Sequence, residues 1–184
     1  MSRLTVYRDD APSVAELDTA DEGRIREGLA RINVGFERWA ASQPLASTDK
    51  DDEILAAYRP EIQRLERAGR YQSVDVLRCA PDHPQREQLR AKFLAEHTHD
   101  DDEVRFFVEG AAMFYLHADA RVHMVLCERN DLISVPAGMR HWFDMGSEPR
   151  FTVIRLFTTP EGWVARFTGD QIARRFPAFA RQES

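Results

Sequence analysis

The sequence predicts a mainly β fold with flanking helices, because short strand-like runs fill its second half and amphipathic helical patterns its first. From Glu103 onward, apolar runs recur about every eight to twelve residues, separated by turn residues such as Gly110 and Pro136-Ala137-Gly138. That spacing is typical of a β-sandwich or a small barrel rather than a parallel α/β sheet. The 184 residues contain no internal repeat, low-complexity tract or Pro/Gly/Ser linker, so we expect one domain.

The first ninety residues alternate helix and strand signals. Apolar residues at helical spacing predict the helices, and alternation predicts the strands. The segment Thr48-Asp49-Lys50-Asp51 resembles a helix start, and Pro60 should kink or split the helix that follows. Pro84 is expected at the first position of a later helix. The expected elements are helix Asp21–Ile32, strand Val34–Trp39, a helix from Asp51 to Leu65, strand Ser73–Cys79 and a helix from Pro84 to Leu94.

The second half is expected to be a succession of short strands closed by a helical tail over Asp170–Phe176. Turn residues punctuate these strands, among them Gly110 and the pair Asn130-Asp131. The expected strands are Glu103–Glu109, Met113–His117, Val122–Cys127, Leu132–Val135, His141–Met145 and Phe151–Phe157.

Charge and composition exclude several classes of function. The chain has 25 Lys and Arg against 31 Asp and Glu, a net charge of −6, which argues against nucleic acid or an anionic membrane as the main partner. No apolar run approaches the ~20 residues that span a bilayer, and the start lacks a signal-peptide core. Cys79 and Cys127 lie in apolar runs and are expected to be reduced, packed thiols. A cytoplasmic protein is therefore expected.

Three histidines and one glutamate have the spacing of a metal site. His97 and His99 alternate, so in a strand both imidazoles point to one face, and Glu103 can return a carboxylate oxygen to the same point. His141, after a Pro-x-Gly turn, can complete the cluster from a neighbouring strand. These ligands suit iron, nickel, cobalt, manganese or zinc, and an octahedral ion so held keeps two open positions. We therefore expect a catalytic metal site.

Other polar residues carry weaker signals. We expect His83, His117 and His123 to be surface or turn residues, and Asp100-Asp101-Asp102 to be a solvated acidic loop. Alternation predicts that Arg105 shares a strand face with Glu103, and that Arg155 lies among apolar residues of a later strand. A buried arginine needs an anionic partner, which can be an internal carboxylate or a substrate.

The count of charges at the site favours a substrate, rather than an internal carboxylate, as the anionic partner of at least one of these arginines. A divalent ion with three neutral imidazoles and one carboxylate carries a net charge of +1. A bound dianionic enolate would leave −1, which one arginine neutralises. Phe93, Phe143 and Trp163 can wall an apolar pocket beside such a substrate, or they can be ordinary core residues.

The segment ending at Gly110, together with Pro136-Ala137-Gly138-Met139-Arg140-His141, resembles the two cupin motifs, a metal site inside a jelly-roll barrel. Ala91 and Asn130 stand where each motif usually begins with glycine, and Met145 where the second usually ends with asparagine. Along nearly its full length the chain further resembles the bacterial acireductone dioxygenases. The residues that carry this resemblance are Lys92–His99, Asp102–Gly110, Asp131–Pro136, His141–Pro149, Pro160–Trp163, Phe167–Asp170, Phe36–Trp39 and Gly69–Ser73.

The resemblance implies an enzyme of methionine salvage that cleaves the acireductone 1,2-dihydroxy-3-keto-5-methylthiopentene with dioxygen. One Fe(II) or Ni(II) ion per monomer is implied. Iron gives 4-methylthio-2-oxobutanoate and formate, whereas nickel gives 3-methylthiopropanoate, formate and carbon monoxide. The implied metal ligands are His97, His99, Glu103 and His141; the implied catalytic residues are Arg105, Glu96 and Asp102; and the residues expected around the substrate are Arg105, Arg155, Phe93, Phe143 and Trp163.

The same resemblance implies one cupin-type domain over residues 1–184, acting as a monomer. Residues 1–95 would form a helix and strand half that packs on the barrel, 96–160 the metal-binding barrel core and 161–184 a C-terminal segment with a short helix. Two alternatives stay open. One is another cupin metalloenzyme with the same ligands, such as a sugar isomerase or a different dioxygenase. The other is a non-catalytic cupin that binds a metal or a ligand.

Overall fold

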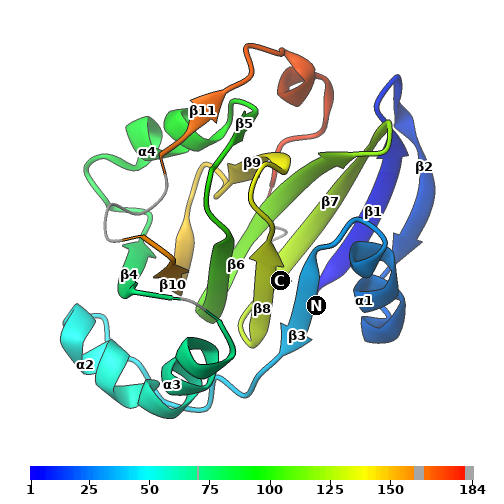
Figure 1. The fold of residues 1–184 in the computed structure, drawn as a ribbon. Helices are drawn as coiled ribbons and strands as arrows, with labels where there is room; N and C mark the ends of the chain where they lie inside the picture. Colours follow the sequence, from blue (N-terminus) through cyan, green and yellow to red (C-terminus); the bar gives the residue numbers. More distant parts are fainter. Residues whose placement is uncertain (70, 160–163, 181–184) are drawn as a thin grey trace.

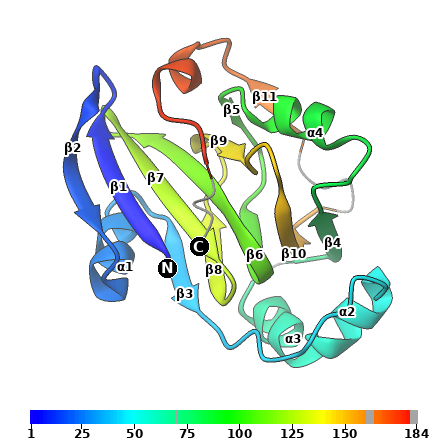
Figure 2. The same cartoon turned by 180° about the vertical axis from the view of Figure 1, so that it is seen from behind.

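The computed structural model describes residues 1–69, 71–159 and 164–180 of the chain. Strands dominate it, with helices at the periphery (Figures 1 and 2). No helix in these ranges is long and apolar enough to cross a membrane. The elements are β1 Arg3–Arg8, β2 Ala11–Thr19, α1 Glu22–Ala30, β3 Gly35–Arg38, α2 Asp51–Ala57, α3 Arg59–Ala68, β4 Ser73–Cys79, α4 Arg86–Phe93, β5 His97–Thr98, β6 Glu103–Ala118, β7 Arg121–Glu128, β8 Asp131–Val135, β9 Arg140–Asp144, β10 Arg150–Phe157, β11 Arg166–Phe167 and the 3-10 helix η1 Ile172–Arg175.

The strands of the described residues form one connected antiparallel sheet built around β6. This long strand pairs with β7, β8, β9 and β10 along different parts of its length. The main path of neighbours runs β11-β5-β9-β6-β7-β1-β2, and its pairings do not close into a ring. The prediction of a mainly β fold with flanking helices is therefore confirmed, whereas closure into a barrel stays a prediction.

The helices of the first half follow the sequence signals closely. Asp21 caps α1, accepting a hydrogen bond from the backbone N–H of Arg24 at 2.8 Å. The expected long helix is split into α2 and α3, with Pro60 in the first turn of α3, as its ring requires. The expectation for Pro84 was wrong. It lies in a turn, and α4 begins only at Arg86.

The expected turn at Gly110 was also wrong, because β6 continues through this residue as one strand. Gly110 has a φ of +71°, and a Cβ there would lie 1.8 Å from the carbonyl oxygen of Arg150. The pairing of β6 with β10 shifts register between Thr152 and Val153, opposite Glu109 and Phe107. Gly110 therefore allows a bulge that bends β6 without ending it.

The bulge changes which residues of β6 face the main core. Before it, Phe107 belongs to the main apolar cluster, whereas Val104 and Phe106 pack on the opposite face, against residues of α2 and α3. After it, the even-numbered Phe114 and Leu116 face the main cluster. The alternation expected from Glu103 to Glu109 is confirmed, but it reverses beyond Gly110.

The two ends of the chain contain the other differences. The hairpin of β1 and β2 was not predicted, and the helical tail is only the 3-10 turn η1.

The expectation of a surface position was wrong for His117 and His123, which are buried in β6 and β7. Cys79 and Cys127 are buried free thiols, as expected.

Candidate metal centre

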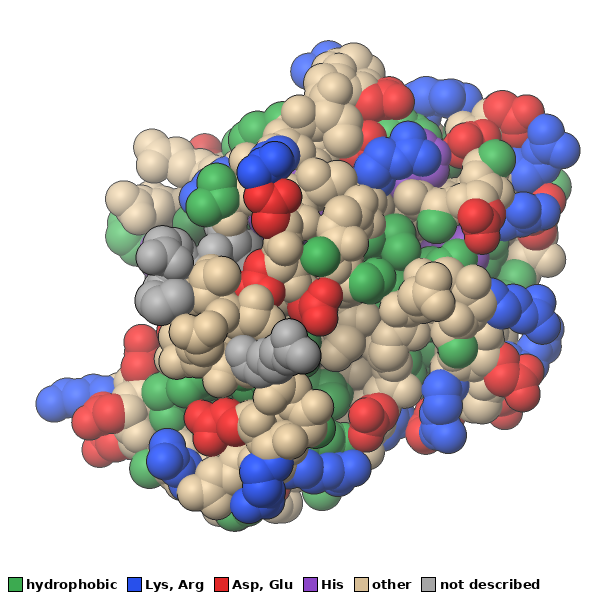
Figure 3. All heavy atoms as spheres, viewed as in Figure 1, with side chains coloured by type: hydrophobic (Ala, Val, Ile, Leu, Met, Phe, Trp, Pro, Cys, Tyr) green, Lys and Arg blue, Asp and Glu red, His purple; other side chains and the backbone are tan. Residues whose placement is uncertain are grey.

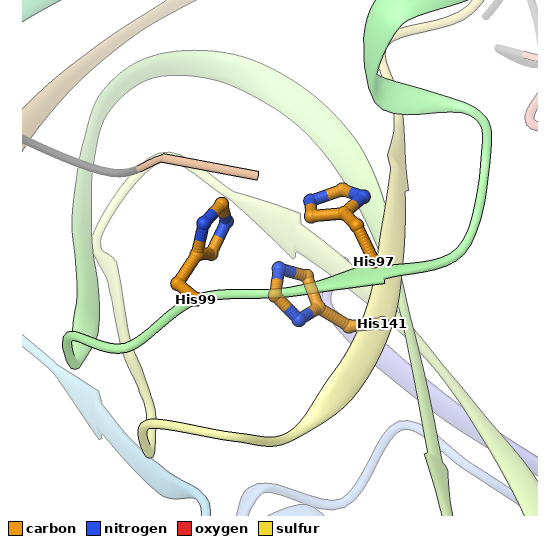
Figure 4. Close-up of side chains that lie close together, drawn as sticks. All are labelled: His97, His99 and His141. Carbon is orange, nitrogen blue, oxygen red and sulfur yellow. The ribbon is translucent and has the colours of Figure 1, made fainter. Parts of the chain in front are cut away.

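Three histidine side chains converge where β5 and β9 lie side by side. His97 in β5 pairs directly with His141 in β9, and His99 follows β5 by one residue. One nitrogen from each ring lies within 4.8 Å of those of the other two, and all three residues are buried. Figure 4 shows the rings turned toward one another. The structure thus brings together the three histidines that the sequence predicted as ligands.

Backbone carbonyls fix the orientation of each imidazole. The Nδ1 atom of His97 lies 2.7 Å from the carbonyl oxygen of Ala95, that of His141 lies 2.8 Å from the oxygen of Met139, and that of His99 lies 3.2 Å from the oxygen of Val164. A carbonyl can only accept, so Nδ1 donates and carries the proton in each ring. Each Nε2 is then left with the free lone pair that binds a metal ion.

Glu103, the first residue of β6, contacts two of these rings. Its Oε2 atom lies 3.0 Å from Nε2 of His141 and 3.2 Å from Nε2 of His99, and its Oε1 atom lies 2.7 Å from Nε of Arg105. Burial disfavours the charged carboxylate. However, the charge of Arg105 favours the carboxylate, and the pKa of Glu103 lies well below its usual value. The site therefore contains a buried, ionised carboxylate.

Burial, together with the neighbouring His141, lowers the pKa of His97 to about 4. At neutral pH this imidazole is uncharged, which is the form that ligates metals. The donor set thus consists of imidazole nitrogens and one carboxylate oxygen held close together in a dry environment. This set suits a first-row transition metal.

Aromatic rings surround the guanidinium group of Arg105. Its central carbon lies 4.1 Å from the ring centroid of Phe143, 5.1 Å from that of Phe114 and 6.0 Å from that of Phe93. Aromatic rings at such distances stabilise a buried guanidinium through cation–π contacts. Phe93 and Phe143 were predicted near the site, whereas Phe114 was not, because the bulge at Gly110 reverses the alternation. Trp163 lies outside the described residues.

Arg155 lies next to Arg105 in the pairing of β10 with β6. Its Nε and Nη2 atoms bind both carboxylate oxygens of Asp75 in β4, at 2.8 and 2.7 Å. An internal ion pair was one of the two partners expected for a buried arginine, and the structure supplies it here. A part for Arg155 in substrate binding stays a prediction.

Glu96 points away from the three histidines. Its Oε1 atom lies 2.5 Å from Nδ1 of His117, and its Oε2 atom accepts a hydrogen bond from the Thr168 hydroxyl at 2.7 Å. His117 in turn lies 3.4 Å from Asp9. Alternation explains this placement, since Glu96 precedes His97 and takes the opposite side of the chain. Glu96 thus anchors the start of β5 through the residues behind the site.

The acidic loop is structured rather than simply solvated. Asp101 is buried and accepts hydrogen bonds from the backbone N–H and the hydroxyl of Thr158, and Asp100 pairs with Arg166. Asp102 is exposed and accepts a hydrogen bond from the backbone N–H of Ala137 at 2.9 Å. The expectation of a solvated loop was therefore wrong for Asp101, and the loop is tied to the turn that precedes His141.

Fold and site together define a mainly β protein with a buried three-histidine cluster that can hold a metal ion. Comparison with known proteins narrows this class. The sequence model of the ARD/ARD' family matches residues 3–165. The acireductone dioxygenase of Parvibaculum lavamentivorans is 58% identical over 179 residues, covering 97% of each chain. That of Pseudomonas aeruginosa strain UCBPP-PA14 is 55% identical over 177 residues, covering 96% of this chain and 98% of the relative.

A solved structure gives the same result. The acireductone dioxygenase from Bacillus anthracis with a cadmium ion in its active centre superimposes with a TM-score of 0.81 at 30% identity, covering 91% of this chain and 98% of the other. The chain belongs to the ARD/ARD' family, the acireductone dioxygenases.

Proposed function

We propose that this protein is the acireductone dioxygenase of a methionine salvage pathway. It cleaves 1,2-dihydroxy-3-keto-5-methylthiopentene with dioxygen. The observation that carries the proposal is the convergence of His97, His99 and His141 in a chain of this family, with the Glu103 carboxylate in contact with the last two. We further propose that the sheet closes as a cupin jelly roll and that the protein acts as a monomer.

His97, His99, His141 and Glu103 would hold one Fe(II) or Ni(II) ion. The fit rests on the orientation of the rings, whose Nδ1 atoms are occupied by backbone carbonyls, and on the ionised state of Glu103. When bound, such an ion supplies a Lewis acid and a template on which a substrate with two adjacent oxygens can chelate. With iron the products are 4-methylthio-2-oxobutanoate and formate; with nickel they are 3-methylthiopropanoate, formate and carbon monoxide.

Arg105 supports the site in two ways. It holds Glu103 ionised and aimed at the histidines through their 2.7 Å contact. Its positive charge also balances the excess negative charge that a dianionic substrate would bring, so it favours loss of the second substrate proton. Phe93 and Phe143, whose rings lie close to the guanidinium of Arg105, would flank the substrate and exclude water.

Glu96 and Asp102 flank the ligands without facing them. We propose that Glu96, held by His117 and Thr168, sets the direction from which His97 approaches the ion. Asp102 ties the loop before β6 to the turn before His141 through the N–H of Ala137. Glu96 would thus position one ligand, and Asp102 would position Glu103 relative to His141.

The decisive experiment is to reconstitute the metal-free protein separately with Fe(II) and Ni(II), add acireductone under air and identify the products. We expect formate with both metals and carbon monoxide only with nickel. His99→Ala should lose both metal and turnover, whereas His83→Ala, in a turn away from the site, should keep both.

Two results would favour the alternatives. Isomerisation of sugar phosphates without oxygen consumption would indicate another cupin metalloenzyme. A metal-loaded protein that turns over neither substrate would indicate a binding module.

A further inference from the structure

His123 is a buried histidine outside the metal centre, and its ring has no hydrogen-bond partner among the described residues. His123 in β7 is only 6% exposed, and neither of its ring nitrogens has a hydrogen-bond partner within the part of the chain that the structure describes. Burial, and next the charge of Arg121, lowers its pKa to about 4, so the ring is neutral and offers one donor and one acceptor. Leaving such a group unmatched destabilises the fold, so a buried histidine of this kind calls for a ligand.

His123 lines a pocket of about 440 Å³ beside α1 and the β1–β2 hairpin. This volume lies within the range of small-molecule sites. The walls are partly apolar, from Val6, Leu17 and Ile32, and the backbone of Gly28 forms part of them. Figure 3 shows basic and acidic side chains intermixed on the surface near the β1–β2 hairpin.

The pocket is separate from the metal centre, although both lie on one face of the sheet. Leu116 in β6 pairs with His141 on one side and with His123 on the other. Residues paired directly across antiparallel strands point to the same face. The three side chains therefore form a row in which Leu116 stands between His141 and His123.

The charges around the pocket come in both signs. Arg121 forms an ion pair with Glu16 at 2.7 Å. Arg31, which caps the end of α1, and Asp119, in the turn before β7, line the same pocket and have no ion pair within the described ranges. Two cations and two anions in the lining favour a ligand that is neutral overall but carries both charges. Apolar walls favour an aliphatic body for this ligand.

We propose that this pocket binds a small zwitterionic amino acid with an aliphatic side chain. Its carboxylate would pair with Arg31, its ammonium group with Asp119, and its side chain would lie among Val6, Leu17 and Ile32. His123 would contribute a hydrogen bond from inside the pocket. Charge-assisted contacts at both ends distinguish such a ligand from a simple acid or amine.

The probe is L-norleucine, titrated calorimetrically into the metal-loaded full-length protein without acireductone. We expect saturable binding of one molecule per chain. Hexanoate, which lacks the ammonium group, and pentylamine, which lacks the carboxylate, should each bind at least about tenfold more weakly. Equal binding of norleucine and hexanoate, or no saturable binding of norleucine, would overturn the proposal.

Variants locate the site. Arg31→Gln and His123→Phe should each weaken norleucine binding by about tenfold or more. The matched control is Arg24→Gln, an exposed arginine of the same helix outside the pocket, which should bind like the wild type. If His123→Phe does not fold, Arg31→Gln and Asp119→Asn, both at exposed positions, decide the outcome.

His99→Ala should keep norleucine binding unchanged, because the proposed site does not use the metal ligands. Loss of norleucine binding in this variant would place the ligand at the metal centre and overturn the proposal. The outcome does not depend on the dioxygenase reaction.

Discussion

At the scale of single residues, the site depends on a small number of polar contacts made in a dry environment. A backbone carbonyl orients each of the three candidate histidine ligands, and the charge of Arg105 favours the ionised form of Glu103. The sequence predicted four candidate ligands, because alternation within a strand and a tight turn can be recognised from neighbouring residues. It could not predict the carbonyl partner of His99 or the ion pair of Arg155 with Asp75, because these contacts join segments far apart in the chain.

Arg105→Gln should reduce kcat/KM by at least about tenfold, because the substrate dianion loses its balancing charge. Arg155→Gln is the matched comparison, since this guanidinium already binds Asp75. We expect it to lower kcat/KM less than Arg105→Gln. Steady-state oxygen consumption, with metal content measured for each variant, checks this. Equal losses in the two variants would show that both arginines serve the substrate.

His123 should make the fold sensitive to acid. Its pKa is about 4 when folded and about 6.5 when exposed, so the unfolded chain takes up the proton first. The stability that the neutral ring contributes is present above pH 6.5 and is lost as the pH falls toward 4. Between pH 7 and pH 5 we expect the free energy of unfolding to drop by about 2 kcal/mol from this group.

Urea denaturation of the metal-free protein at both pH values measures this drop. His123→Phe should show a smaller drop than the wild type. An identical drop in the two proteins would mean that His123 does not contribute.

At the scale of elements, β6 organises the molecule. Its first half carries Glu103 and Arg105, and its second half lies beside β9, which carries His141. The sequence predicted two strands here, because glycine usually marks a turn. In the structure Gly110 instead bends one strand. The close approach of Gly110 to Arg150 depends on the pairing of β6 with β10, which the sequence does not reveal. Because this bulge reverses the alternation, the position of Phe114 could not be predicted from the sequence.

Gly110→Ala should destabilise the fold by at least about 3 kcal/mol, since it adds a clash with the Arg150 carbonyl to an unfavourable positive φ. Gly138→Ala is the control. That glycine has a similar φ of +77° but open space around its missing Cβ. It should cost only about 1–2 kcal/mol. Thermal and chemical denaturation measure both, and equal costs would show that the close approach to β10 does not matter.

At the scale of the whole molecule, the candidate metal centre joins β5, the start of β6 and β9, which are far apart in the sequence. We propose that residues 1–184 fold as one unit around this arrangement, because a single apolar cluster draws on residues from Leu4 to Val153. Strand content and the helices of the first half could be predicted from periodicity. The β1–β2 hairpin and the order of strands could not, since pairing partners depend on tertiary packing.

Metal binding should therefore stabilise the whole fold. At a free Ni(II) concentration of about 100 times the dissociation constant, we expect a gain of about 2.7 kcal/mol and a higher Tm. Differential scanning calorimetry should show one transition that moves upward with added nickel. His99→Ala should not respond, whereas His83→Ala should respond like the wild type. Two separate transitions, of which only one responds to nickel, would contradict folding as one unit.

The most direct test of the central claim is oxygen uptake by the iron-loaded protein in the presence of acireductone. We predict that oxygen consumption requires both the acireductone and the metal, matches the acireductone consumed mole for mole, and is lost in His99→Ala. Oxygen uptake that persists in His99→Ala, or its absence from iron-loaded wild-type protein supplied with acireductone, would contradict the assignment of this site.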